Sequence, residues 1–130
     1  MPVLDASVVV EFLAFGKHEE IAKARILGGE RAFWTPELLD AEVGSTLRRV
    51  VRGGTKDADH AAEALGELRS LPIHRVSHER LAPFAWLLRD NVSFYDALYI
   101  SLAQLLDQPL LTFDARLARA GVDAEIEVLA

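Results

Sequence analysis

The sequence has no cysteine among its 130 residues, which excludes disulfide bonds and thiolate metal sites. A chain without disulfides fits a reducing compartment, and we expect a cytoplasmic protein. No apolar run approaches the roughly 20 residues that a membrane-spanning helix needs. The opening residues M-P-V-L-D lack the basic segment of a signal peptide and carry an acid at position 5. We therefore expect no association with a membrane.

Positive charge is also scarce, because acidic side chains outnumber Lys and Arg and the formal net charge is −6. Nucleic acids are bound mainly through Lys and Arg, so this balance at first argues against such a partner. Bound divalent cations would offset much of the deficit. The sign of the net charge therefore decides little by itself.

The length and the hydrophobic content of 51% indicate one compact domain that spans residues 1–130. Short apolar segments alternate with segments of helical periodicity, which is typical of parallel crossover units. We therefore predict an α/β fold, an α/β/α sandwich with a central, mainly parallel sheet. Strands are expected at 3–4, 32–35, 73–76, 110–113 and 125–128, and helices at 6–13, 18–27, 36–52, 55–70, 78–89, 93–106 and 114–120, with Pro36 opening the third helix.

Four acids stand at the ends of predicted strands or on the inner side of predicted helices. Because an α/β sheet gathers the carboxyl ends of its strands along one edge, acids far apart in sequence can meet there. Converging carboxylates repel each other unless cations lie between them, and hard divalent cations prefer oxygen ligands. The pattern predicts a metal site that supports phosphodiester cleavage. The four acids are Asp5, Glu42, Asp96 and Asp114.

Three of these acids have a structural alternative, because Asp is a preferred residue at helix starts. Asp5 and Asp114 each precede a predicted helix and could cap it. Ser93 and Asp96 have the spacing of a capping box, in which the acid would only close the helix end. These alternatives stay open at the level of the sequence.

Glu42 lies at the border of the buried stripe of its predicted helix, where an ionised carboxylate is costly unless it is neutralised. Arg49, two turns further along the helix, could neutralise it structurally. A metal ion is the other way to satisfy it.

The strings around the four acids resemble, in this order, the motifs of the PIN-domain family, and most closely those of the VapC toxins of bacterial toxin–antitoxin pairs. The strings are V-L-D-A-S-V-V-V-E-F, L-L-D-A-E-V-G-S-T-L-R-R, S-F-Y-D-A-L-Y-I-S-L-A and L-L-T-F-D-A-R-L. The resemblance implies that the four acids bind Mg²⁺, with Mn²⁺ as a substitute. It also implies that Ser7 and Thr112, which flank the first and last acids, support these ligands.

The same resemblance implies an activity and partners. The expected activity is that of an endoribonuclease that cuts RNA, often transfer or ribosomal RNA, and leaves a 5′-phosphate. The expected partners are a second copy of the chain, in a homodimer, and a VapB-type antitoxin that fills the active-site groove.

Arginines that follow Glu42 could hold the RNA. Arg48 and Arg52 are expected to project to solvent on one side of their helix, where they could bind phosphates. An ordinary charged helix face is an equally good interpretation. Arg49 is left out of this prediction because it could pair with Glu42.

Two rival functions remain. A metal-dependent phosphatase on a similar fold typically uses a D-x-D motif, whereas Asp5 is followed by Ala6 and Ser7, so this class is disfavoured. A non-catalytic binding module would keep the acids as helix caps and act only through its partner. A titration with Mn²⁺ distinguishes this binding module from a metal-dependent enzyme, because a set of helix caps has no reason to bind Mn²⁺.

Overall fold

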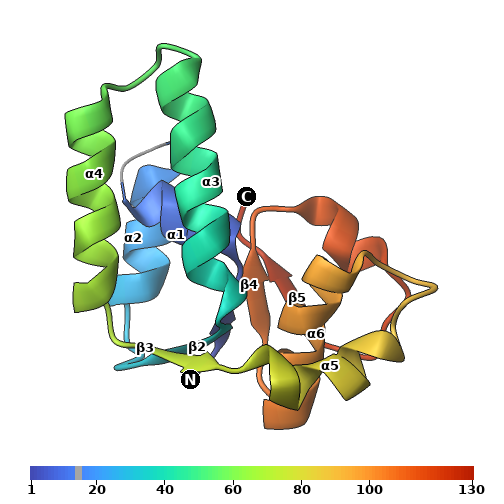
Figure 1. Cartoon of the computed structure of the whole chain (residues 1–130). Helices are drawn as coiled ribbons and strands as arrows, with labels where there is room; N and C mark the ends of the chain where they lie inside the picture. Colours follow the sequence, from blue (N-terminus) through green and yellow to red (C-terminus); the bar gives the residue numbers. More distant parts are fainter. Residues whose placement is uncertain (14–15) are drawn as a thin grey trace.

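A parallel sheet forms the centre of the protein, in a computed structural model that describes residues 1–13 and 16–130. Within these residues the strand order is β3-β2-β1-β4-β5, and every neighbouring pair is parallel. The predicted α/β/α fold with a parallel sheet is confirmed (Figure 1). The strands are β1 (Val3–Leu4), β2 (Phe33–Pro36), β3 (Ile73–Val76), β4 (Leu110–Thr112) and β5 (Ile126–Val128).

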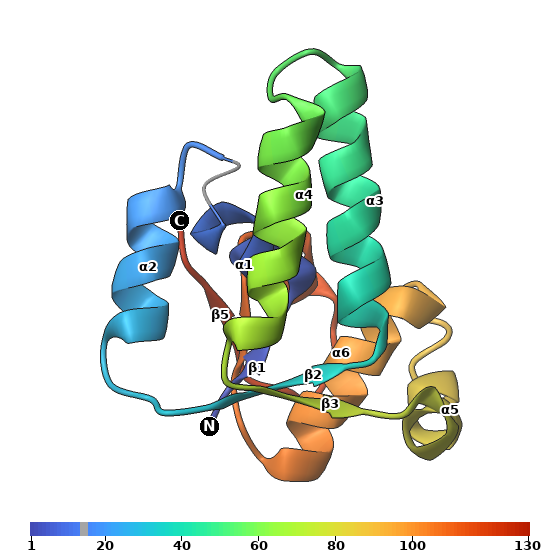
Figure 2. The same cartoon turned by 60° about the vertical axis from the view of Figure 1, so that its left-hand side comes forward.

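Helices cover both faces of the sheet (Figures 1 and 2). One face carries α1 (Ala6–Phe12), α2 (Glu19–Leu27), α3 (Leu38–Arg52) and α4 (Ala58–Glu67), followed by the 3₁₀ turn η1 (Leu68–Ser70). The other face carries α5 (His78–Trp86) and α6 (Phe94–Leu106), and the 3₁₀ helix η2 (Ala115–Arg119) follows β4. No helix in the described part of the chain has the length and apolar character needed to cross a membrane.

The two central strands divide the core into two halves. Successive side chains of a strand point to opposite faces, so Leu4 and Leu111 join the cluster under α1 to α4. Val3 and Leu110 join the cluster under α5 and α6. All four side chains are almost fully buried. Burial on both faces holds β1 and β4 side by side. It therefore also fixes the positions of the residues that follow the two strands.

Three boundaries differ from the sequence-based prediction. Pro36 ends β2 instead of opening the next helix, since it pairs with Val76 and the following amide of Glu37 makes the hydrogen bond to the Val76 carbonyl. The fourth helix begins at Ala58 because the Asp57 carboxylate caps it. The fifth helix ends at Trp86, and turns continue from there to residue 91.

Candidate active site

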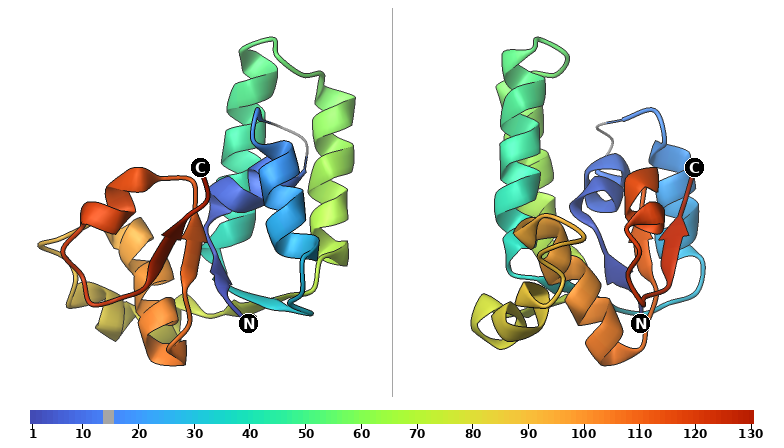
Figure 3. Two further views of the ribbon diagram at one scale, coloured as in Figure 1. Left: turned by 180° about the vertical axis from the view of Figure 1, so that it is seen from behind. Right: turned by 90° about the vertical axis from the view of Figure 1, so that its right-hand side faces the viewer.

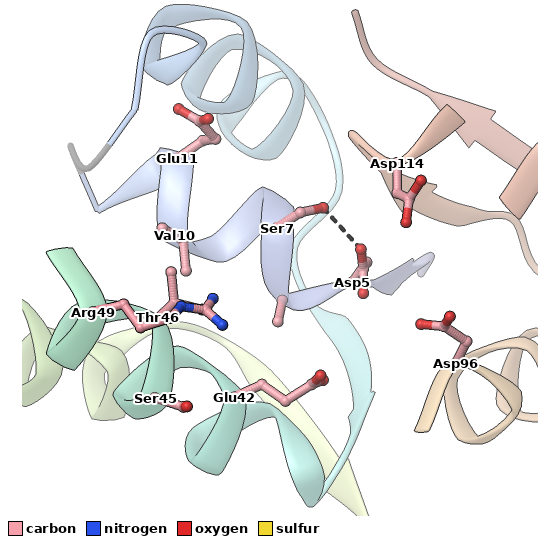
Figure 4. A pocket seen from close by; sticks show the side chains of 11 residues that line it. Asp5, Ser7, Val10, Glu11, Glu42, Ser45, Thr46, Arg49, Asp96 and Asp114 are labelled. Atoms are coloured by element: carbon pink, nitrogen blue, oxygen red, sulfur yellow. Dashed lines mark hydrogen bonds between the residues drawn. The ribbon is translucent and has the colours of Figure 1, made fainter. Parts of the chain in front are cut away.

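Carboxylates from several elements surround one cavity at the carboxyl edge of the sheet (Figure 4). The cavity has a volume of about 490 Å³. Asp5 follows β1 and Asp114 follows β4, while α3 contributes Glu42 and α6 contributes Asp96. The structure thus brings all four predicted acids to one place. We call this the acid cavity; its charged lining residues are Asp5, Glu11, Glu42, Asp96, Asp114 and Arg49.

Asp5 occupies the N-cap position of α1 but makes no capping hydrogen bond with its side chain. Its Oδ2 instead accepts hydrogen bonds from the hydroxyls of Ser7 and Thr112, both at 2.8 Å. Thr112 lies 107 residues further along the chain. The simple cap alternative for Asp5 is therefore wrong. The carboxylate is held by a network that spans β1 and β4.

Ser7 and Thr112 hold more than Asp5. The Ser7 hydroxyl accepts a hydrogen bond from the Phe113 amide at 3.0 Å, and the Thr112 hydroxyl accepts one from the Asp114 amide at 2.9 Å. The two hydroxyls therefore tie the start of α1 to the segment after β4. They fix Asp5 through its carboxylate and Asp114 through its backbone.

Burial raises the pKa of Asp5 above its ordinary value, and the nearby charge of Asp96 acts in the same direction. The hydroxyls of Thr112 and Ser7 oppose this shift by stabilising the ionised form. Asp5 is thus an acid whose negative charge is costly in this protein. A cation in the cavity would relieve that cost.

Glu42 meets no cationic side chain among the described residues. Its Oε1 is buried and makes no hydrogen bond there, and the buried hydroxyl of the adjacent Tyr99 is likewise without a geometrically acceptable partner. Burial raises the pKa of Glu42; the Tyr99 hydroxyl lowers it, and the charges of Asp5 and Asp96 raise it again. The expected alternative, a pair with Arg49, does not form.

Asp96 forms half of a capping box. The Ser93 hydroxyl accepts a hydrogen bond from the Asp96 amide at 3.1 Å, which caps α6. Within residues 1–13 and 16–130, the Asp96 carboxylate makes no hydrogen bond or ion pair that would complete the box. The cap is therefore made by Ser93, while the carboxylate of Asp96 is left pointing into the acid cavity (Figure 4).

Asp114 does cap the segment that follows it. Its Oδ1 accepts from the Arg116 amide at 3.0 Å, and the Arg116 guanidinium forks onto both carboxylate oxygens, with Nη2 to Oδ2 at 2.5 Å. Arg116 is the main cause of the lowered pKa of Asp114. The structural alternative for Asp114 is thus realised here, although its carboxylate also lines the acid cavity.

The arginines of α3 line two different hollows, and Arg48 and Arg52 are exposed on one side of the helix, as predicted. Arg49 lines the acid cavity, where its Nη2 donates to Thr46 at 3.1 Å. Arg48 and Arg52 are exposed, but they line a separate, mostly apolar groove between α3 and α4. Their contact with RNA stays a prediction, since they do not border the acids.

Sequence reasoning missed three residues of the site. Glu11 lies one turn after Ser7 on the same side of α1, and Tyr99 follows Asp96 by three residues on α6, so helical spacing could have found both. Arg116 was not predicted, because a residue two positions after an acid does not follow the three- or four-residue spacing of a helix face.

The donor chemistry of the acid cavity fits a hard divalent cation. Its acidic lining residues offer only oxygen atoms as ligands, and among the described residues only Asp114 of these acids forms an ion pair. As the side chains lie, no three acidic or histidine residues of the described chain are close enough to share one metal ion. Ligation would therefore need carboxylate rotation, above all at Asp114, which Arg116 now holds.

The fold and the acid cavity have counterparts in known proteins. A family model described as the PIN domain matches residues 3–123. Ribonuclease VapC1 of Mycobacterium tuberculosis is 46% identical over 129 residues, which cover 98% of this chain and 96% of the relative. Ribonuclease VapC3 of the same organism is 39% identical over 122 residues, with 94% and 88% covered. This chain belongs to the VapC group of the PIN-domain family.

Solved structures support the same fold for this PIN domain. The crystal structure of Mycobacterium tuberculosis VapC20, described as a toxin that cleaves the sarcin-ricin loop, has a TM-score of 0.70 at 19% identity and covers 95% of this chain and 97% of its own. VapBC2 from Rickettsia felis, bound to a DNA fragment from its promoter, has a TM-score of 0.69 at 15% identity and covers 96% of each chain. At these identities the likeness concerns the fold.

Proposed function

We propose that this PIN domain is an Mg²⁺-dependent endoribonuclease, the toxin of a toxin–antitoxin pair. One observation carries the proposal: the acid cavity is lined by five carboxylates, and among the described residues only Asp114 of these five forms an ion pair. A fold that needed these acids only as helix caps would not leave them uncompensated. The ribonuclease names of the relatives support the same function.

In this proposal Asp5, Glu42, Asp96 and Asp114 hold Mg²⁺ or, in its place, Mn²⁺. The bound ion would supply an activated water and stabilise the charge of the leaving oxygen. Hydrolysis by such a water would break the P–O3′ bond and leave a 5′-phosphate and a 3′-hydroxyl. No protein nucleophile is needed.

The chain's own residues prepare this reaction by fixing the acids. Ser7 and Thr112 hold Asp5 in one orientation through two 2.8 Å hydrogen bonds. The cap by Ser93 fixes the first turn of α6 and with it the position of Asp96. Tyr99, whose pKa burial raises far above its usual value, stays neutral beside Glu42. These contacts fix the segments that carry the acids, while the carboxylates themselves would still have to rotate to share one ion.

The partners of the proposal follow from the relatives. A VapB-type antitoxin is proposed because VapBC2 is described as a complex that includes both components. RNA, of the transfer or ribosomal class, is the proposed substrate, and the cytoplasm is the proposed place of action. A homodimer is proposed on the family resemblance alone.

The rival functions differ in what they require of the site. A phosphatase that uses an aspartate nucleophile needs a second acid beside the first, and Ser7 stands there, bonded to Asp5 instead. A binding module without catalysis needs no free carboxylates. The lack of an ion pair at Glu42 therefore argues against the binding module, and Ser7 beside Asp5 argues against the phosphatase.

The proposal is tested by incubating the purified chain with single-stranded RNA in Mg²⁺ and in excess EDTA. We expect cleavage with 5′-phosphate ends in Mg²⁺, none in EDTA, and none for Asp96→Asn in either. Asp123→Asn, which removes an exposed acid that does not line the acid cavity, serves as the matched control and should cleave normally. Cleavage that persists in EDTA, or in Asp96→Asn, would contradict the metal mechanism.

A further inference from the structure

A second groove adjoins the acid cavity and is lined by more basic than acidic side chains. It has a volume of about 600 Å³ and lies between the turn after α5, the start of α6 and η2. We call it the basic groove; its charged lining residues are Arg89, Arg116 and Arg119, with Asp90 and Asp96. Figure 3 shows these segments together, on the side of the sheet away from α2.

Two residues connect the basic groove to the acid cavity. Asp96 lines both. Arg116 lines the basic groove, and its guanidinium forms a hydrogen-bonded ion pair with Asp114. Asp114 in turn lines the acid cavity. The two hollows are therefore neighbouring parts of one surface, with the carboxylates at one end and the guanidiniums at the other.

The arginines of the basic groove are available to a ligand. Arg116 has 76% of its side chain exposed although it pairs with Asp114. Arg119 is exposed and forms no ion pair within the described residues, and Arg89 is exposed and lies over the Trp86 ring at 5.1 Å. In a chain of net charge −6, three exposed guanidiniums gather around this one groove, where they outnumber the two acids Asp90 and Asp96.

The walls of the basic groove are fixed. The Asn91 side chain donates to the carbonyls of Ala120 at 3.1 Å and Gly121 at 3.4 Å, which ties the turn after α5 to the end of η2. Ser93 caps α6 at the floor of the groove. A groove held open by such contacts binds an extended ligand without first having to order itself.

We propose that the basic groove holds the phosphate backbone of the RNA strand whose scissile bond lies in the acid cavity, with Arg89 and Arg119 as phosphate contacts. The proposal rests on the proposed ribonuclease function and assigns its substrate a path. A phosphodiester between the carboxylates needs cationic groups on its flanking phosphates, and guanidinium is suited to that role. Arg116 stands at the junction between the two parts.

This path differs from the one that the sequence suggested. Arg48 and Arg52 lie in the last turns of α3, and that end of the helix rises away from α5 and α6 (Figure 1). They border an apolar groove, which suits a phosphate chain poorly. The two pairs of arginines therefore form a matched comparison, with two exposed charges removed in each case.

The test measures the affinity of a labelled single-stranded oligouridylate by fluorescence anisotropy, in EDTA, over a range of salt. For Arg89→Ala/Arg119→Ala we expect weaker binding and a salt slope that is smaller by roughly 0.7 for each phosphate that the protein no longer neutralises. For Arg48→Ala/Arg52→Ala we expect the unchanged slope. Arg89→Lys/Arg119→Lys should retain most of the slope, because it keeps both charges. Thermal melts check that each variant is folded.

Three results would overturn the proposed path: an unchanged slope in the Arg89/Arg119 alanine variant, an equal fall in the Arg48/Arg52 variant, or a full loss in the lysine variant. The first two place the strand elsewhere, and the third indicates a structural role. If the unaltered protein neither binds nor cleaves RNA, the proposed function itself fails, and this path with it.

Discussion

At the scale of single residues, the negative charges of Asp5 and Glu42 are unfavourable to the metal-free fold. Burial raises the pKa of both Asp5 and Glu42, so the native state binds protons more tightly than the unfolded chain. The free energy of unfolding therefore falls as the pH rises from the ordinary pKa of each acid toward its raised pKa in the folded protein. This loss of stability persists at neutral pH. These residues are retained at a cost to stability, as expected of groups that serve chemistry.

Glu42→Gln should therefore stabilise the metal-free protein at neutral pH, by less than about 1 kcal/mol, because it removes a half-buried charge that has no ion pair and that solvent partly screens. The gain should vanish below the ordinary pKa of 4.5, where Glu42 is protonated in both states. Urea unfolding in EDTA at the two pH values measures this. Destabilisation at neutral pH would show that the Glu42 charge has a structural partner.

The pKa of Asp114 is shifted in the opposite direction to those of Asp5 and Glu42. Arg116 lowers its pKa, and its side chain is 28% exposed, so the contribution to stability is small. In Arg116→Gln the pKa of Asp114, followed by NMR of the carboxyl carbon, should rise toward the ordinary 3.8. Arg119→Gln is the control and should give a smaller rise. Equal pKa values in the Arg116 variant and the unaltered protein would mean that the fork seen here is not maintained in solution.

At the scale of the elements, helix starts and strand ends place the acids. Short apolar segments predicted every strand, and the strand ends predicted Asp5 and Asp114. The sequence could not show that Pro36 closes β2, because Pro is suited both to a helix start and to a strand end. Helical spacing placed Arg49 on the side of Glu42, and Arg49 does line the acid cavity. The sequence could not show whether the two side chains pair, because that depends on the rotamer of Arg49, which donates to Thr46 instead.

The cap of α6 offers a test at this scale. Ser93→Ala should cost about 1 kcal/mol of stability, as loss of an N-cap usually does, and should weaken Mn²⁺ binding because the first turn carries Asp96. Ser77→Ala removes the equivalent cap of α5, where the Ser77 hydroxyl accepts from the Arg80 amide. It should cost similar stability without changing the affinity for Mn²⁺. Equal Mn²⁺ affinity in the two variants would show that the Ser93 cap does not position Asp96 for metal binding.

At the scale of the whole molecule, the parallel sheet converts distant sequence positions into one site. Asp5 and Thr112 become hydrogen-bonded neighbours because Leu4 and Leu111 are paired and buried in the same core half. The order of the four motifs was enough to predict this gathering and the family. The division of the surface into an acidic and a basic part was not predictable, because it depends on how the turn after α5 meets η2.

Binding of a divalent cation by the carboxylates of the acid cavity underlies the whole proposed function, and calorimetric titration with Mn²⁺ measures it. We expect that the unaltered protein and Asp90→Asn bind Mn²⁺ alike and that Asp96→Asn loses at least tenfold in affinity, a change of about 1.4 kcal/mol. Asp90 borders the basic groove and does not line the acid cavity, so it controls for the loss of one negative charge nearby. Equal Mn²⁺ affinity in all three proteins, or none in the unaltered protein, would show that these carboxylates do not form a metal site.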